Sequence, residues 1–211
     1  MNGIFRNGIL LIKKINMVFY KIFVMRIFYK YQMPQMGKNV FIARPIKITP
    51  QFLFVDNNVY IAKNCRLEGV AIYEGQVYNP SIRLGENVSI QQSLHLTCAS
   101  SIVLEKDVAI AANVTITDIE HPYIDISIPI EKQHLSTNPV LIKSESKVYN
   151  NAVILPGTII GKHSVVGANS ILSGVFPDYC VIVGAPAYIV KRYCFESNLW
   201  RKTDKTGNFI D

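Results

Sequence analysis

The residue of this chain best suited to acid–base chemistry is His121, which stands in the run Thr117–Tyr123 between titratable side chains. An imidazole with an ordinary pKa of about 6.5 can take a proton from a hydroxyl group at neutral pH. Asp118 and Glu120 are close enough in sequence to orient the ring and to stabilise its protonated form. The run therefore predicts a general base, although a histidine beside carboxylates is, taken alone, more often a solvated loop residue.

The other histidines and the cysteines do not suggest a metal. His95 stands beside an aliphatic residue and is expected to point outward, while His163 falls in a turn. No two histidines have the close spacing that a three-histidine zinc site needs. The four cysteines also lack the paired spacing of a disulfide framework or of a metal site. We therefore expect no metal and a reducing, cytoplasmic setting. The cysteines are Cys65, Cys98, Cys180 and Cys194.

The elements that must position His121 are hexapeptide repeats. In residues 140–174 every sixth residue is aliphatic, and the residue two places earlier is small or β-branched. A helix repeats near 3.6 residues and a strand at 2, so a period of six indicates short strands joined by corners. Such coils bury their aliphatic side chains only by stacking, which is the signature of a parallel β-helix. The aliphatic positions are Ile142, Val148, Ile154, Ile160, Val166 and Leu172, and the smaller ones are Val140, Ser146, Ala152, Thr158, Ser164 and Ser170.

The repeat recurs upstream, with three irregular steps. A step of 17 residues from Leu67 to Leu84 predicts one slightly off-register turn, and a step of 8 from Leu96 to Leu104 predicts a two-residue bulge. The longest step places residues 117–139, and with them His121, in a loop outside the solenoid. A loop of that length in a compact repeat is usually functional. The upstream aliphatic positions begin with Ile42, Ile48 and Phe54, with Val40, Ile46 and Phe52 at the smaller positions.

Charge and composition divide the chain into three parts. The net charge is +7, yet the first 55 residues hold nine basic residues and no acid. Residues 1–33 read as a basic amphipathic helical segment that either lies on an anionic membrane surface or caps the solenoid, and the two roles are compatible. Its basic residues alternate with large aliphatics, which argues against nucleic acid. Residues 34–190 form the β-helix, and residues 191–211 a short C-terminal helix and a loosely ordered tail.

Taken together, these motifs identify a resemblance. The hexapeptide repeats, the D-x-x-H-x-Y run with a downstream glutamine, V-x-I-L-P-G-x-x-I-G and V-x-P-x-x-x-V-x-x-G-x-P-A resemble the left-handed β-helix acetyltransferases. The resemblance covers residues 37 to about 193. It is strongest to the branch that O-acetylates sugars during capsule, exopolysaccharide or lipopolysaccharide assembly. The left-handed sense of the all-β fold is implied by this resemblance alone.

The resemblance implies a homotrimer with active sites between neighbouring subunits, acetyl-coenzyme A as donor and no metal. His121 matches the catalytic histidine of the family, with Asp118 beside it. The positions that match acceptor contacts are Gln91, Tyr123 and Gln133. Those that match coenzyme A contacts are Asn150, Ala168, Ser173, Gly174, Tyr188 and Lys191.

Some positions depart from the family pattern. Lys147-Val148-Tyr149 replaces the common Trp-Ile-Gly, and Ile119 replaces the first histidine of a His-x-His pair. Gly174 and Tyr188 stand where a lysine commonly meets the coenzyme A phosphates. Lys143, Lys147 and Lys162 are candidates to supply the missing positive charge.

The sequence therefore favours an acetyl-coenzyme A-dependent O-acetyltransferase that acts on a sugar hydroxyl of a surface-polysaccharide precursor, with His121 as general base. Two alternatives remain open. One is N-acetylation of an amino sugar, which needs less help from a base. The other is a non-catalytic trimeric scaffold at the membrane, which the altered phosphate-contact positions suggest.

Overall fold

The structure is a computed structural model that describes residues 27–210, so most of the basic segment 1–33 lies outside the described residues. The described end of that segment contains the short helix α2 (Lys30–Gln32). Tyr29 and Met33, which flank α2, belong to the buried core cluster of the solenoid. This end of the segment therefore packs on the first coil.

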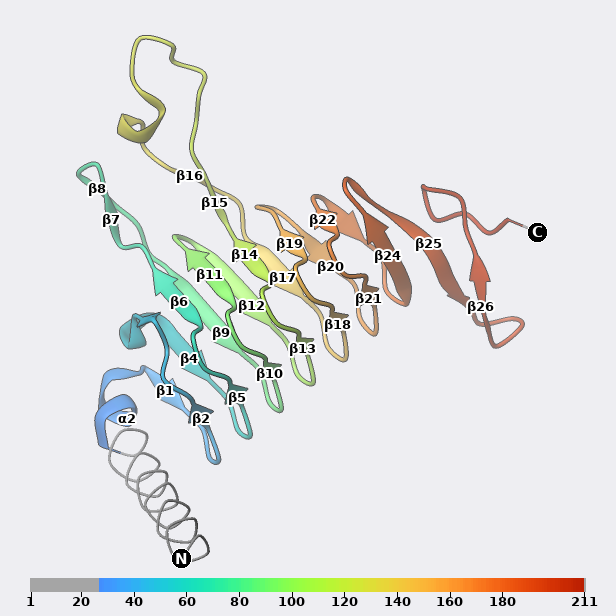
Figure 1. The fold of residues 1–211 in the computed structure, drawn as a ribbon, viewed down its shortest axis with the longest axis horizontal. Coiled ribbons are helices and arrows are strands. Elements are labelled where there is room, and N and C mark those ends of the chain that lie inside the picture. Colours follow the sequence, from blue (N-terminus) through green and yellow to red (C-terminus); the bar gives the residue numbers. More distant parts are fainter. Residues whose placement is uncertain (1–26, 211) are drawn as a thin grey trace, which may run out of the picture.

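Residues 35–184 form stacked coils whose short strands build three parallel sheets, and the whole has the shape of an elongated prism (Figure 1). In the regular part, paired residues of adjacent coils are 18 apart, as Lys147 and Val165 are. The prediction of a parallel β-helix is confirmed.

The strands fall into three sheets that the chain visits in turn. Sheet 1 contains β1 (Gln35–Met36), β4 (Leu53–Val55), β9 (Ser81–Leu84), β12 (Ser101–Leu104), β17 (Val140–Ile142), β20 (Ile159–Ile160) and β23 (Val175–Phe176). Sheet 2 contains β2 (Phe41–Ile42), β5 (Tyr60–Ile61), β10 (Ser89–Ile90), β13 (Ala109–Ile110), β18 (Lys147–Val148), β21 (Val165–Val166), β24 (Cys180–Gly184), β25 (Ala187–Cys194) and β26 (Leu199–Lys202). Sheet 3 contains β3 (Lys47–Ile48), β6 (Arg66–Gly69), β11 (His95–Cys98), β14 (Thr115–Thr117), β19 (Val153–Ile154) and β22 (Ile171–Leu172).

The core is a column of aliphatic side chains, as the period of six predicts. Each predicted large position between Ile142 and Leu172 is fully buried, and so are the smaller residues two places earlier. The polar ones among them are bonded: Ser146 Oγ donates to the Gly161 carbonyl at 2.9 Å, and Thr158 Oγ1 to the Leu155 carbonyl at 2.6 Å. Small hydroxyl residues therefore fit inside because the corner backbone accepts their protons.

Two of the three corners of the prism are built from residues in the left-handed backbone region. The first corner joins sheet 1 to sheet 2 and the second joins sheet 2 to sheet 3. Asparagine tolerates a positive φ better than other non-glycine residues, which explains its frequency here. Side chains also bond along the stack: Asn58 Nδ2 donates to Asn87 Oδ1 at 3.1 Å. The first corner has positive φ at Asn39, Asn58, Asn87, Asp107, Glu145, His163 and Tyr179.

The third corner, which joins sheet 3 back to sheet 1, carries every large insertion. The predicted loop leaves here, and its root is a two-stranded ribbon of β15 (Ile119–Glu120) and β16 (Ser136–Thr137). Its outer part contains a short 3-10 helix, η3 (Ile130–Lys132). The two-residue bulge also falls here, between β11 and β12. The extruded loop and the bulge are therefore confirmed.

The interpretation of the 17-residue step is wrong. Between Leu67 and Leu84 the chain does not make an off-register turn but leaves the prism as a β-hairpin of β7 (Ile72–Tyr73) and β8 (Gln76–Val77). Glu74 and Gly75 at its tip both have positive φ, as a tight hairpin turn requires. Figure 1 shows the hairpin and the loop projecting from the same side of the prism.

The register predicted for the first coil is also wrong. Leu53 and Val55 are fully buried, whereas Phe54 points outward, where the Arg83 guanidinium carbon lies 4.3 Å from its ring centroid. Ile46 is 74% exposed and is not an inner residue. For Phe54 the cause is the 3-10 turn η2 (Pro50–Phe52), which shifts the following strand by one residue and so exchanges its two faces.

The predicted C-terminal helix and loose tail are absent from the described residues. Lys191 and Arg192 lie instead in β25, which pairs antiparallel with β24 and with β26. The tail beyond is ordered by Asp204, whose carboxylate accepts bonds from Thr206 and Asn208. These bonds hold the pKa of Asp204 at about 2. The last coil leaves an open strand edge, and a hairpin covers it better than a helix, because it satisfies the unpaired backbone groups.

Candidate active site

His121 follows β15 at the root of the extruded loop, against the hairpin. Its imidazole is partly buried, and its ring centroid lies 5.4 Å from that of Tyr73, with the rings edge to face at 74°. Nδ1 of His121 is buried and has no hydrogen-bond partner among the described residues. A buried polar atom without a partner is uncommon in a folded protein, which makes His121 a candidate for a functional role.

Asp118 is not the partner of His121, and this prediction is wrong. The Asp118 side chain is fully buried, and its Oδ1 accepts a bond from the Ala99 amide at 2.8 Å. Oδ2 accepts bonds from the amides of Ser100 at 2.8 Å and Ser101 at 2.7 Å. The carboxylate therefore fastens the root of the loop to the bulge of the preceding coil.

The surroundings of Asp118 also affect the pKa of a neighbouring thiol, that of Cys98. Cys98 Sγ lies 3.3 Å from Asp118 Oδ2. Burial first, and the Asp118 charge second, raise the pKa of the Cys98 thiol strongly. Cys98 therefore stays a protonated thiol that contributes to packing. All four cysteines are buried and unpaired.

The predicted acceptor residues occupy different places. Tyr123 is 67% exposed on the loop. Gln133 lies in the same loop, where its Nε2 donates to the carbonyls of Asp125 at 2.9 Å and Ile128 at 3.0 Å and so holds a turn together. Gln91 is exposed at the second corner, and sheet 3 separates it from His121 within one chain. A single chain thus brings only Tyr123 and Gln133 onto the element that carries His121.

The hairpin is the part of this region that sequence reasoning missed. The Tyr73 hydroxyl lies 2.8 Å from the Glu131 carbonyl oxygen, and Tyr78 Oη accepts a bond from the Leu135 amide at 2.7 Å. Glu74 pairs with Lys132 at 3.3 Å. The Glu74-Gly75 pair between two short runs of β-forming residues was the available signal.

The positions that match donor contacts are exposed, and four of them flank the C-terminal half of sheet 3. Asn150 and Ala168 are stacked at the second corner, where the Asn169 amide donates to the Asn150 carbonyl at 3.0 Å. Ser173 and Gly174 lie at the third corner, below the loop. Tyr188 and Lys191 lie on β25.

Two of the three lysines proposed to replace the missing charge do not reach this surface. Lys143 pairs with Asp178 at 3.2 Å and Lys162 with Glu145 at 3.1 Å, both at the first corner. Lys147 Nζ lies 5.6 Å from the centroid of the Tyr149 ring. A lysine that sequence reasoning did not select, Lys205, lies with its Nζ 5.3 Å from the centroid of the Tyr188 ring.

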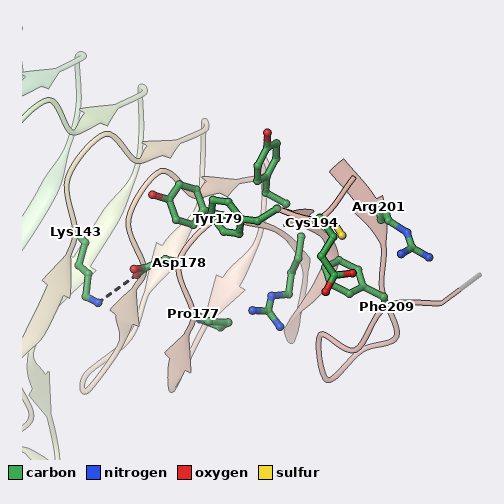
Figure 2. Close-up of a pocket in the computed structure, with 11 residues that line it drawn as sticks. Lys143, Pro177, Asp178, Tyr179, Cys194, Arg201 and Phe209 are labelled. Carbon is green, nitrogen blue, oxygen red and sulfur yellow. Dashed lines mark hydrogen bonds and ion pairs between the residues drawn. The ribbon is translucent and has the colours of Figure 1, made fainter. Parts of the chain in front are cut away.

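The C-terminal hairpin and the first corner line an open pocket of about 720 Å³, which is distinct from the surroundings of His121. Figure 2 shows the Lys143–Asp178 ion pair on one side of it and Arg201 and Phe209 on the other. Tyr179 and Tyr193 each pack edge to face with Phe195 in its wall, and the centroids of Tyr179 and Phe195 are 5.2 Å apart. These rings hold the C-terminal hairpin against the last coil.

No metal or membrane-spanning feature accompanies the site in residues 27–210. In that range no group of three or more His, Cys, Asp or Glu side chains could hold a metal ion. None of the helices within the same range is long and apolar enough to cross a bilayer.

Comparisons with known proteins agree with this architecture. Residues 139–174 match the family model of the bacterial transferase hexapeptide, six repeats. A protein of Escherichia coli K12 named as the lipopolysaccharide biosynthesis O-acetyl transferase WbbJ is 37% identical over 128 residues, which are 57% of this chain and 65% of that protein. The galactoside O-acetyltransferase of Lactococcus lactis is 31% identical over 132 residues, 62% of this chain and 61% of that enzyme. The chain thus spans less than two thirds of the length of these relatives.

Solved structures share the fold at low identity. AntD, an N-acyltransferase from Bacillus cereus solved with dTDP and coenzyme A, has a TM-score of 0.65 at 21% identity, over 80% of this chain and 88% of AntD. A galactoside acetyltransferase in complex with coenzyme A has a TM-score of 0.56 at 20% identity, over 87% of this chain and 76% of its own.

Proposed function

We propose that this chain, whose residues 139–174 match the bacterial transferase hexapeptide model, transfers an acetyl group from acetyl-coenzyme A to a sugar hydroxyl of a surface-polysaccharide precursor. The observation that carries the proposal is the position of His121. It lies at the root of the one long loop of the described solenoid, with an imidazole nitrogen that is buried but unbonded. The imidazole lies outside the aliphatic core cluster and its Nδ1 has no hydrogen-bond partner among the described residues, which supports a role in chemistry.

In the proposed reaction His121 acts through Nε2, because Nδ1 is buried. Nε2 takes the proton of the acceptor hydroxyl as its oxygen attacks the thioester carbonyl. Backbone N–H groups stabilise the oxyanion of the tetrahedral intermediate. The carbon–sulfur bond then breaks, the acetyl ester remains on the sugar, and the imidazolium returns its proton to the departing thiolate.

The donor surface is proposed to run from Asn150 and Ala168 across sheet 3 to Ser173 and Gly174. The exposure of these positions supports a ligand that lies along the outside of the coils. Lys191 and Lys205, near Tyr188, would hold the phosphates of coenzyme A by charge. The left-handed sense of the solenoid is part of the same proposal.

We also propose a homotrimer with the site between subunits. Gln91 and His121 lie on opposite edges of sheet 3, so a Gln91 beside the acceptor would come from a neighbouring copy. The hairpin and the loop expose apolar side chains that a neighbour would cover. They include Ile72 at 69%, Val77 at 70%, Ile124 at 87% and Ile126 at 98% exposed.

The location of the protein is proposed to be cytoplasmic, where acetyl-coenzyme A is available. The basic residues of segment 1–33 support peripheral attachment to an anionic membrane, each contributing about 1 kcal/mol near the surface. Vesicle co-sedimentation of the full chain, with and without residues 1–26, tests this attachment. Equal sedimentation of the two would contradict it.

Incubation with acetyl-coenzyme A and paired acceptors tests the main proposal. The acceptors are nucleotide sugars that differ only in one hydroxyl or amine, and mass spectrometry reads the product. We expect an added acetyl group on the hydroxyl form, removed by mild base as an ester is. An acetyl group only on the amine would favour the N-acetyltransferase, and calorimetry without coenzyme A binding would favour a scaffold.

A further inference from the structure

The hairpin at residues 70–80 contacts the extruded loop at three separate points. Tyr73 reaches Glu131 and Glu74 reaches Lys132, both in η3 in the outer part of the loop. Tyr78 bonds the returning strand at Leu135, whose side chain is buried. The two insertions stand on the same corner, two coils apart, so the hairpin supports the loop along its length.

Tyr73 is the member of this set that also touches the imidazole. Its ring meets that of His121 edge to face, while its hydroxyl lies 2.8 Å from the Glu131 carbonyl oxygen and 2.9 Å from a Glu131 carboxylate oxygen. One side chain therefore spans from the root of the loop to its outer helix. Tyr78 holds the loop by a hydroxyl in the same way but makes no ring contact with His121 among the described contacts.

A histidine that acts as a base needs a fixed ring orientation, and the usual hydrogen bond to its second ring nitrogen is missing among the described contacts of His121. In most such sites the second ring nitrogen bonds a carboxylate or a carbonyl, which sets the orientation of the imidazole. Nδ1 of His121 has no such partner in the part of the chain that the structure describes, and the nearby Asp118 carboxylate is taken up by three backbone amides. Packing against an aromatic ring is the remaining constraint.

We propose that Tyr73 is a positioning residue for His121, and that the hairpin serves as the rigid wall against which the catalytic imidazole is set. This rests on the proposed function, in which His121 is the base. Desolvation first, and the Glu131 carboxylate second, raise the pKa of the Tyr73 phenol, so its hydroxyl stays a donor to Glu131 throughout the neutral range. The hydroxyl end of the Tyr73 side chain is thereby anchored on Glu131, while its ring contacts the imidazole of His121.

The test compares three variants of the full chain. Tyr73→Leu removes the aromatic contact, Tyr73→Phe keeps the ring and removes the anchor, and Tyr78→Phe removes a matched hydroxyl that does not touch His121. We expect Tyr73→Leu to lower kcat by about 10- to 100-fold, because misplacing a catalytic group by about 1 Å costs up to about 100-fold. The KM for acetyl-coenzyme A stays unchanged. Tyr73→Phe and Tyr78→Phe each lose only a few-fold.

Nuclear magnetic resonance of the histidine rings supplies a readout independent of turnover. The chain has four histidines, so the His121 signal is assigned by its loss in His121→Ala. Tyr73→Leu should shift this signal, whereas Tyr78→Phe should leave it as in the wild type. Equal spectra for Tyr73→Leu and Tyr78→Phe would overturn the positioning role. A wild type without acetyl transfer would refute the proposed function, while the spectra would still decide the role of Tyr73.

Discussion

The first and third corners of the prism are built from the same coils but differ in what they permit. At the first corner each coil turns through one left-handed residue, and side chains such as those of Asn58 and Asn87 bond from coil to coil. At the third corner the hairpin, the bulge and the extruded loop depart. A corner that is bonded to its neighbours at every level resists insertion, whereas one without such a column can be lengthened. The candidate site is found at the corner that can vary.

Replacement of His121 at the third corner and of His163 at the first corner should give the largest difference, in the rate of acetyl transfer. We expect His121→Ala to lower acetyl transfer about 10²- to 10⁴-fold, the usual contribution of a positioned base. The affinity for acetyl-coenzyme A should not change. His163→Asn is the matched control, because His163 has a φ of 53° at the first corner and asparagine accepts that conformation.

Steady-state turnover and calorimetry measure the two effects on the same preparations. Near wild-type turnover for His121→Ala would remove the residue from the mechanism. A loss of turnover that came with a lower melting temperature would instead be a loss of folded protein.

The next largest difference is expected in stability, between a carboxylate substitution at the third corner, Asp118→Ala, and one at the first corner, Asp107→Ala. Asp118→Ala leaves the buried Ala99 amide and the part-buried amides of Ser100 and Ser101 without this acceptor, and we expect a loss of about 2–4 kcal/mol in the free energy of unfolding. Asp107→Ala removes one exposed hydrogen bond, which Asn87 Nδ2 donates at 2.8 Å, and places an alanine at a positive φ. We expect a loss of about 1–2 kcal/mol in the free energy of unfolding. Urea denaturation measures the free energy of unfolding of both variants. Equal losses would show that Asp118 does not fasten the root of the loop.

Substitution of a lysine on the proposed donor surface should weaken coenzyme A binding, whereas substitution of a lysine at the first corner should not. Lys191→Ala should weaken acetyl-coenzyme A binding about tenfold, as loss of one charge-assisted contact to phosphate does. Lys143→Ala should leave the affinity unchanged, because Lys143 is paired with Asp178 at the first corner. Calorimetric titration with coenzyme A measures both. The opposite ranking would place the donor phosphates in the pocket beside the C-terminal hairpin.

The smallest effect concerns the asparagine stack itself. Asn58→Ala should cost about 1–2 kcal/mol of stability, since alanine adopts a positive φ poorly and the bonds to Asn39 and Asn87 are lost. Asn58→Gly keeps the conformational freedom and should lose less, which isolates the contribution of the bonds. Thermal unfolding ranks the two. An Asn58→Gly variant less stable than Asn58→Ala would show that backbone conformation is not what selects asparagine here.

The sequence by itself determined the features that depend on the repeat. The aliphatic period from Ile142 to Leu172 requires a solenoid, because stacked coils bury one large and one smaller residue in every six. The interruption after Ile116 requires a loop, and its histidine stands out as a base. The solenoid and the loop are confirmed because each depends on residues that are close in sequence, whereas the role of His121 stays a prediction.

Tertiary structure decided which distant residues meet. Asp118 is three residues from His121 but bonds Ala99, Ser100 and Ser101 in the coil below, since stacking brings them to the same corner. The hairpin meets the loop for the same reason, so that Tyr73 contacts His121 across two coils. Residues 187–194 contain strand-favouring Tyr, Ile and Val side chains, but that this segment pairs as β25 with the open strand edge of the last coil is decided by the tertiary structure.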